Sequence, residues 1–272
     1  MANSLKRRTS TNIYIMKYIL VLLLSVPFLV SAQEKVKDFY ESKRLKSIST
    51  VNDGVQNGPY TEWYENGNKK SEGNFSEGEK DGKWQEWYEN GKLWSLSFFE
   101  KGVPSGRYVD YDMNGAKVEE GHMERGIPNG AFTTWYNDGR VRSEGVLKNG
   151  MKVEVWTTYF ENGKKKDKGE YKMNRRVGQW EEWHENGKMK SRGVYFAGIP
   201  HGTWTFWFDN GRKSKEGDYF EGNLKGLWTV WHDNGQKANQ GNYKGETKVG
   251  PWKYWNTDGE FDREESHPVP NE

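Results

Sequence analysis

The sequence predicts an all-β protein, an elongated single-layer antiparallel sheet built from tandem β-hairpin repeats. Three observations support this fold class. A 24-residue period runs through most of the chain, an Asn-Gly or Asp-Gly dipeptide recurs once in each period, and two aromatic residues stand at fixed places before that dipeptide. A fixed period of this length is typical of repeat architectures, in which each unit buries its apolar surface against its neighbours.

The composition agrees with a thin sheet. Only 33% of the residues are hydrophobic and 29% are charged, which is too little apolar material for a large closed core. Aromatic residues make up 15% of the chain, with 14 tryptophans and 32 glycines against 8 prolines, and this distinguishes it from a disordered chain. Aromatic rings are therefore expected to carry the apolar packing.

Residues 1–32 have the features of a secretory signal peptide. Lys17 precedes an apolar run, residues 18–30, and the small residues Ser31 and Ala32 follow it, in the order typical of such a peptide. We therefore predict cleavage near Ala32 and an exported mature chain, periplasmic or secreted. Met16 is an alternative true start, and a retained leader that anchors the chain is the alternative to cleavage.

The positive charge of the chain belongs to this leader. Residues 1–32 hold four basic residues and no acidic one, so the mature chain has 37 basic and 39 acidic residues, a net charge of −2. Nucleic-acid binding, which requires a basic surface, is not expected. The sequence has no cysteine, which excludes disulfides, thiolate metal sites and cysteine catalysis.

Each 24-residue unit contains two aromatic positions. A glycine opens the unit, one ring follows two positions later, and a second ring follows three positions after the first. The first ring column comprises Tyr60, Trp84, Tyr108, Phe132, Trp156, Trp180, Trp204, Trp228 and Trp252. The second ring column comprises Trp63, Trp87, Tyr111, Trp135, Tyr159, Trp183, Trp207, Trp231 and Trp255. Together they hold every tryptophan except Trp94.

The dipeptide, from Asn66-Gly67 in the first unit to Asp258-Gly259 in the ninth, predicts a two-residue type I′ hairpin turn. Such a turn sets the register, with residue 65 facing 68, 63 facing 70 and 60 facing 73. It also places Glu89 opposite Lys92 as a cross-strand ion pair, with equivalents in later units. Each first-column ring is expected to cover the glycine opposite it in its own hairpin.

The repeats divide the chain into four segments. Residues 1–32 are the leader, 33–57 a degenerate half-repeat that caps the array, 58–262 nine hairpin repeats, and 263–272 a flexible tail. The fifth unit has Glu154 in place of the opening glycine, and we expect a local irregularity or bend there. Ser97 replaces the mid-strand glycine of the second unit.

The pattern G-x-W-x-x-W-Y-x-N-G-K, followed by E-G-x-Y, resembles the variant MORN repeats of bacterial proteins over about residues 38–262. The resemblance implies the hairpin-repeat fold. For function it implies a membrane-associated, scaffolding or protein-binding module, and some members of the group carry an antitoxin-like label. MORN arrays are often attached to a catalytic domain, and no such domain fits this sequence.

No catalytic residue, cofactor or metal site is expected. His184 and His232 share a column but stand two units, or about 19 Å, apart, whereas a zinc ion needs ligands within about 2.2 Å. Adjacent acids such as Glu181 and Glu182 point to opposite faces of a strand and cannot flank one substrate bond. We therefore expect that the protein is not an enzyme.

The ring columns are the candidates for binding. Strand parity places them on opposite faces of the sheet unless a bulge intervenes, so one column is expected to form the core and the other to remain available. The most regular units favour Trp183, Trp207, Trp231 and Trp255 as a partner-binding surface. Trp94 lies in an unusually apolar second unit and is a further candidate, with packing against the N-terminal cap as its alternative.

The leading functional hypothesis is an exported, non-catalytic module that binds or braces a protein partner at the cell envelope. One alternative is an antitoxin or immunity protein, which export would restrict to toxins outside the cytoplasm. Another is a membrane-surface or glycan-binding module, although a net charge of −2 gives no general attraction to anionic lipid. The sequence leaves the identity of the partner and the oligomeric state open.

Overall fold

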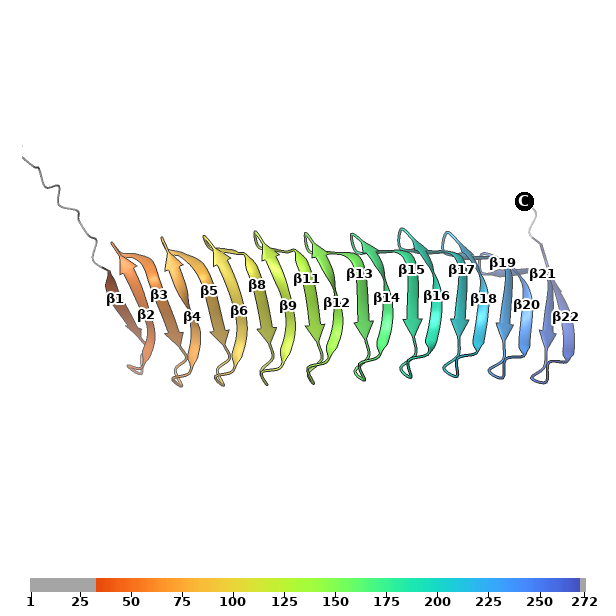
Figure 1. Cartoon of the computed structure of the whole chain (residues 1–272), viewed down its shortest axis with the longest axis horizontal. Helices are drawn as coiled ribbons and strands as arrows, with labels where there is room; N and C mark the ends of the chain where they lie inside the picture. Colours follow the sequence, from red (N-terminus) through yellow and green to blue (C-terminus); the bar gives the residue numbers. More distant parts are fainter. Residues whose placement is uncertain (1–32, 270–272) are drawn as a thin grey trace, which may run out of the picture. The chain divides into compact units, whose positions relative to one another are not determined.

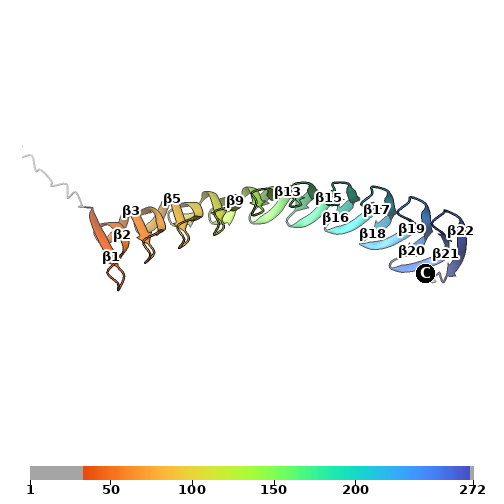
Figure 2. The same cartoon turned by 90° about the horizontal axis from the view of Figure 1, so that it is seen from below.

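The computed structural model describes residues 33–269, and all regular structure in this range is β-strand. The expected leader, residues 1–32, lies outside the described residues. The strands form one antiparallel sheet of consecutive hairpins, laid side by side in chain order (Figure 1). Figure 2 shows the same row from below, with each hairpin bowed rather than flat. The predicted fold class is confirmed.

Ten hairpins make up the described sheet. The first comprises β1 (Glu34–Phe39) and β2 (Leu45–Asn52). The nine repeats supply β3 (Val55–Trp63), β4 (Lys69–Ser76), β5 (Glu79–Trp87), β6 (Leu93–Glu100), β7 (Val103–Pro104), β8 (Gly106–Tyr111), β9 (Lys117–Glu124), β10 (Ile127–Pro128), β11 (Gly130–Trp135), β12 (Val141–Lys148), β13 (Met151–Tyr159), β14 (Lys165–Lys172), β15 (Arg175–Trp183), β16 (Met189–Phe196), β17 (Ile199–Trp207), β18 (Lys213–Phe220), β19 (Asn223–Trp231), β20 (Lys237–Lys244), β21 (Thr247–Trp255) and β22 (Phe261–His267). The first strands of the third and fourth units are interrupted, at Ser105 and Asn129.

Both ends of the array are more regular than expected. β1 and β2 form a hairpin of their own that pairs with β3, where the sequence suggested half a unit. β22 pairs with β21 as far as His267, so residues 263–267 belong to the sheet and not to a tail. The charged residues of β1 and β22 suit edge strands, which tolerate them because one side meets solvent.

The turns contain three residues, and the predicted two-residue type I′ turn is wrong. In the sixth unit the backbone N–H of His184 donates to Lys188 O, and that of Gly187 donates to His184 O, both at 2.8 Å. Within this loop only Gly187 has a positive φ, of 91°, as in a type I turn closed by a left-handed glycine and a bulge. Asn186 keeps an ordinary φ, and its Oδ1 accepts the Lys188 N–H at 2.9 Å.

The longer loop changes the register beside the turn. Trp180 pairs with Gly193 as predicted, but Trp183 pairs with Met189 and not with residue 190, because a bulge lies between the two pairs. The residues expected to form ion pairs across the turn are consequently not opposite each other. Lys188 Nζ donates instead to Asn210 O in the next turn at 2.8 Å.

Neighbouring turns are joined along most of this edge by such bonds. Lys92 Nζ donates to Asn114 O at 2.8 Å rather than pairing with Glu89, and Asn186 Nδ2 donates to Asp209 O at 2.6 Å. Most turn asparagines thus have two roles, since the oxygen closes its own turn and the nitrogen binds the next one; in the third unit Asp112 Oδ1 accepts from Ala116 N–H in place of Asn114. Asp138 lacks that nitrogen, and Arg140 donates to Glu161 O in its place.

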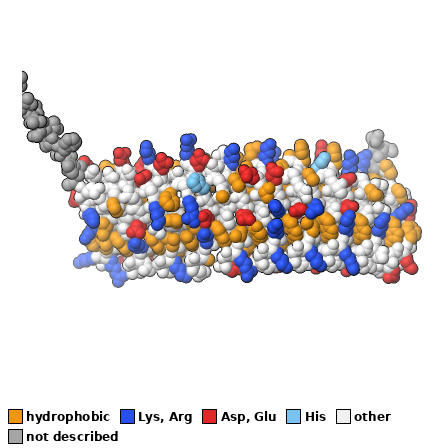
Figure 3. Space-filling view, in the orientation of Figure 1, with side chains coloured by type: hydrophobic (Ala, Val, Ile, Leu, Met, Phe, Trp, Pro, Cys, Tyr) orange, Lys and Arg blue, Asp and Glu red, His pale blue; other side chains and the backbone are white. Residues whose placement is uncertain are grey.

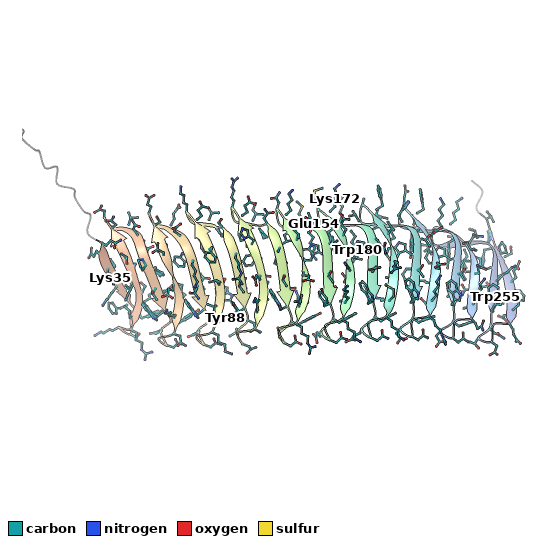
Figure 4. All side chains as sticks on the ribbon, in the orientation of Figure 1. Lys35, Tyr88, Glu154, Lys172, Trp180 and Trp255 are labelled. Atoms are coloured by element: carbon teal, nitrogen blue, oxygen red, sulfur yellow. The ribbon has the colours of Figure 1, made fainter. Side chains whose placement is uncertain are left out.

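The two ring columns lie on opposite faces, as strand parity predicts. Tyr159 of the second column donates to Glu144 at 2.6 Å. Glu144 pairs with Thr157, so Tyr159, Glu144 and Thr157 share one face. Trp156, the neighbour of Thr157 on the strand, points to the other face. We call the face that carries the first column the core face and the opposite one the ladder face. Figure 4 labels one ring of each column: Trp180 lies midway along its strand and Trp255 nearer the turns.

The first ring column is the core of the sheet. Its six tryptophans are at most 5% exposed. Each indole N–H donates to the carbonyl ten residues earlier, as Trp180 does to Glu170 at 3.2 Å. Tyr195 stands edge-on between Trp180 and Trp204, with ring centroids 5.9 and 5.1 Å away. Such edge-to-face pairs contribute about 0.5–1.5 kcal/mol each beyond burial.

Each core tryptophan covers a glycine of the preceding hairpin. A Cβ atom added to Gly193 would lie 2.1 Å from the ring of Trp204, although the partner of Gly193 within its own hairpin is Trp180. The prediction that a ring covers each of these glycines is therefore correct. The predicted ring is wrong, because the tryptophan that covers the glycine comes from the next hairpin and not from the same one. Where Ser97 replaces the glycine, Tyr108 lies close to its own Gly121 instead.

Glu154 does not interrupt its strand. It adopts a φ of 59°, close to the 66° of Gly178 at the same place in the next unit, and β13 runs unbroken through it. The expected irregularity is wrong because glutamate accepts the left-handed conformation, at a cost on the order of 1–3 kcal/mol.

Candidate functional site

The second ring column forms a ladder of partly exposed rings. Trp183, Trp207, Trp231 and Trp255 end strands β15, β17, β19 and β21, and all four are half-buried. One ring per hairpin corresponds to a separation of about 9.6 Å between successive rings. Figure 3 shows an apolar stripe along the length of the array, with Lys and Arg side chains beside it. The structure therefore brings the four predicted tryptophans onto one surface.

Lysine side chains lie over these rings. The Nζ atom of Lys165 is 5.8 Å from the ring centroid of Trp183, and those of Lys213 and Lys237 are each 5.7 Å from Trp231 and Trp255. Each lysine belongs to the hairpin that precedes the hairpin of its ring. In the hairpin before Trp207, the same position of the repeat is occupied by Met189. A cation within about 6 Å of a ring face contributes roughly 0.5–1 kcal/mol at an exposed site. A lysine thus lies over three of the four rings.

One of these lysines also holds a carboxylate. Lys213 Nζ is 2.7 Å from Glu216 Oε2, and this hydrogen bond holds the pKa of Glu216 below its ordinary value. Lys165 and Lys237 form no ion pair within residues 33–269. Exposed ion pairs contribute only about 0–1 kcal/mol, so a carboxylate from a ligand could replace Glu216 at small cost.

Tyr159 interrupts the tryptophan ladder with a fixed hydroxyl group. Burial, followed by the hydrogen bond to Glu144, raises the pKa of Tyr159 to about 12. The phenol is therefore neutral at physiological pH and stays bound to Glu144. It separates the C-terminal run of four tryptophans from the N-terminal part of the ladder.

Trp94 lies apart from the ladder. It is 46% exposed and occupies the bulge of the second repeat, between the pairs Glu86–Ser95 and Trp87–Leu93. With Tyr60 and Trp84 it lines an open cavity of about 310 Å³ on the core face. The ring of Trp94 is 5.9 Å from Tyr88, so it packs within its own repeat, and the expected packing on the N-terminal cap is wrong.

The two histidines that share a column link neighbouring hairpins. Nε2 of His184 is 2.8 Å from Trp207 O, and Nε2 of His232 is 3.0 Å from Trp255 O. A carbonyl oxygen only accepts, so each imidazole donates. Tyr64 and Tyr88 make the same bond in earlier units. Among residues 33–269 no three His, Cys, Asp or Glu side chains are grouped to hold a metal ion. No membrane-spanning helix was found in the part of the chain that the structure describes.

Sequence reasoning missed the lysines of the ladder. Each stands two positions after the turn glycine, as Lys165, Lys213 and Lys237 do, and the recurrence was visible as N-G-x-K. The assumption of a two-residue turn concealed their role, because it placed the neighbouring residue opposite the second ring. The bulge brings these lysines to the ladder face instead.

Comparison with known proteins supports the repeat assignment. The MORN repeat variant family matches residues 56–77, 80–101, 155–173, 176–196 and 224–244. A search of curated proteins found no match. Solved structures with partial similarity include "Crystal Structure of TcdB2-TccC3-TEV", with 12% identity and a TM-score of 0.21 over 84% of this chain. "Crystal Structure of TcdB2-TccC3" has 12% identity and a TM-score of 0.20 over 85%.

The chain spans about 15% of the length of both of those chains. The five matched segments fall on the hairpins β3–β4, β5–β6, β13–β14, β15–β16 and β19–β20, in the same 24-residue register. The unmatched hairpins between them have the same pairing and the same two ring columns. The chain is therefore a MORN-repeat protein of the variant type.

Proposed function

We propose that this protein is a non-catalytic binding module that holds an extended protein segment along the ladder face. The observation that carries the proposal is the ladder itself, in which half-buried rings recur once per hairpin with lysines over them. Aromatic rings offer large amphipathic contact areas at low entropic cost. A ligand that lies along the array meets the same contact many times, so weak single contacts add up.

The spacing of the rings favours one backbone conformation of the ligand. Three residues of a polyproline II helix advance about 9.3 Å and complete one turn, which is close to the hairpin step of about 9.6 Å. Every third side chain of such a segment therefore returns to the same face, one per ring. In a β-strand three residues cover a similar length, but side chains alternate faces, so only every second ring would be contacted.

The charges on the ladder face favour an acidic ligand. Lys165 and Lys237 lie over rings without forming an ion pair in the described part of the chain, and Lys213 is held only by the partly exposed Glu216. Carboxylates spaced three residues apart would meet these ammonium groups while the pyrrolidine rings pack on tryptophan. We therefore infer that the preferred ligand is a proline-rich acidic segment of a partner protein.

The peptide (Pro-Pro-Glu)5, labelled with a fluorophore, tests this directly. We expect saturable binding to the full chain, and at least about a tenfold loss of affinity when Trp207 and Trp231 are both changed to Ala. The matched control is Phe206→Ala with Val230→Ala, which alters the neighbouring residues on the core face of the same strands. This control is expected to bind like the unmodified chain.

Two results would refute the binding proposal. One is equal affinity of the ladder variant and the control, with circular dichroism showing both folded. The other is unfolding of the ladder variant, which would make the second column part of the core. Tighter binding of an alternating (Thr-Glu)7 peptide, or binding of glycan oligomers instead, would overturn the polyproline II assignment.

Export of the protein is a further part of the proposal. Lys17, the apolar residues 18–30 and the small residues that end at Ala32 support it, and it would place the binding module at the cell envelope. Mass spectrometry of the protein recovered from the periplasm or the medium should find Gln33 at its N-terminus. An intact leader in the cytosol would contradict this.

A further inference from the structure

The two ends of the described sheet are open edges. Among residues 33–269, β1 pairs only with β2, and β22 pairs only with β21. The outer side of each strand therefore presents unpaired backbone N–H and C=O groups, which can pair with another chain. Within the array the corresponding side of every return strand is covered by the first strand of the next hairpin.

The register between hairpins defines how a second copy would continue the array. At the junction of β14 and β15, Asp167 pairs with Glu182 and Lys168 pairs with Glu181. On β22 the residues equivalent to Asp167 and Lys168 are Arg263 and Glu264. On β1 the residues equivalent to Glu182 and Glu181 are Asp38 and Lys37. We propose that the protein associates head to tail, with β22 of one copy pairing antiparallel to β1 of a second copy.

The charges of the two edges are complementary in this register. Arg263 would face Asp38 of the second copy on the core face, and Glu264 would face Lys37 on the ladder face. Opposite charges directly across an antiparallel pair stabilise it, and like charges oppose it. Edge strands often carry charges that prevent association, but here every charged pair would be of opposite sign.

Exposed rings at the two ends occupy matching positions. Inside the array, the first residue of a return strand lies over the second-column ring of the next hairpin, as Lys69 does over Trp87 at 5.4 Å. The same positions at the ends are Phe261, which is 59% exposed, and Phe39, which is 58% exposed. Head-to-tail pairing would bring these two rings together and remove both from water.

The position of the mid-strand glycine, which recurs in the return strands, is also compatible with pairing to a second copy. Inside the array a glycine is needed wherever the tryptophan of the next hairpin lies over it, as Trp252 does over Gly241. At the C-terminal edge this position is Glu265, and the residue that would approach it is Val36 of the second copy, which has no ring. The glycine is thus absent at an edge where no ring would need it, as it is at Ser97, where Tyr108 lies close to Gly121 of its own hairpin instead.

Sedimentation velocity of the full chain over a range of concentrations tests the proposal. A head-to-tail contact leaves a free edge at each end of the oligomer unless the rotation between copies closes a ring, so we expect oligomers whose mean size rises continuously with concentration. Reversing the charges of one end, by Lys37→Glu with Asp38→Arg, should weaken association about tenfold or more. Reversing both ends, by adding Arg263→Asp with Glu264→Lys, should restore it, because the edges are then complementary again.

The matched control is Lys83→Glu, which changes an exposed charge within the array and should leave association unchanged. A monomer at all concentrations up to about 1 mM would overturn the proposal. So would association that ignores the charge reversal of one end, or that the second reversal does not restore. This inference concerns the ends of the sheet and stands independently of the ligand proposed for the ladder.

Discussion

Changing Trp204 to Ala is expected to remove about 3–5 kcal/mol of local stability from the hairpins on either side of it. Trp204 is only 5% exposed, and its indole N–H donates to Val194 O at 3.2 Å. It also separates the rings of Tyr195 and Tyr219, whose centroids lie 5.1 and 6.1 Å away. Truncation would open a cavity in a sheet that has only one core layer, and would leave that carbonyl without its indole donor.

Hydrogen exchange read by mass spectrometry is the suitable measurement for this variant. Units of a repeat array contact only their neighbours, so a single global unfolding temperature would average over intact hairpins. Protection of β16, β17 and β18 should fall, while that of β3 to β6 stays as in the unmodified chain. Unchanged protection at β17 would show that the first column is not the core.

Changing Gly193 to Ala should destabilise the same junction by about 1–3 kcal/mol or more. The added Cβ would lie 2.1 Å from the Trp204 ring, so either the ring or the strand must move. Backbone strain is not the cause, because Gly193 has no left-handed φ. In an extended strand alanine would otherwise be the better residue by roughly 0.5–1 kcal/mol.

A double variant separates this clash from other effects. With Trp204 already changed to Ala, Gly193→Ala should cost less than about 0.5 kcal/mol, because the ring is gone and the two changes share one contact. Hydrogen exchange of β16 and β17 in the unmodified chain, the two single variants and the double variant gives the coupling free energy between the two positions. Additive losses would mean that the ring of Trp204 does not lie over Gly193.

Most of the fold could be predicted from the sequence because a strict period fixes many positions at once. The glycines, rings and Asn-Gly dipeptides predicted antiparallel hairpins, and the pairing of Tyr60 with Gly73 is confirmed. The prediction failed beside the turn, where Asn-Gly is compatible with both two-residue and three-residue loops. The three-residue loop is accompanied by bonds to the next hairpin, such as that from Lys188 to Asn210 O, which the period within one unit does not reveal.

The candidate site could be predicted only in part. The alternation of side chains along a strand predicted that the two ring columns lie on opposite faces, but it did not predict which column is buried. Burial follows from the glycine of the preceding hairpin, which lets Trp204 lie flat over Gly193. The hydrophobic composition of a unit was a poor guide to binding. Some exposed hydrophobic side chains do not belong to the ladder, among them Val194, Leu227 and Trp94.

The central claim is that one ring column holds the sheet together while the other is available to a ligand. Trp204 and Trp207 lie on the same strand, three residues apart and on opposite faces, so the comparison of Trp204→Ala with Trp207→Ala tests it most directly. Hydrogen exchange of β17 and β18 should show a loss of about 3–5 kcal/mol for the first variant and only about 1–2 kcal/mol for the second. Equal losses in the two variants would contradict the claim, because the second column would then be core as well.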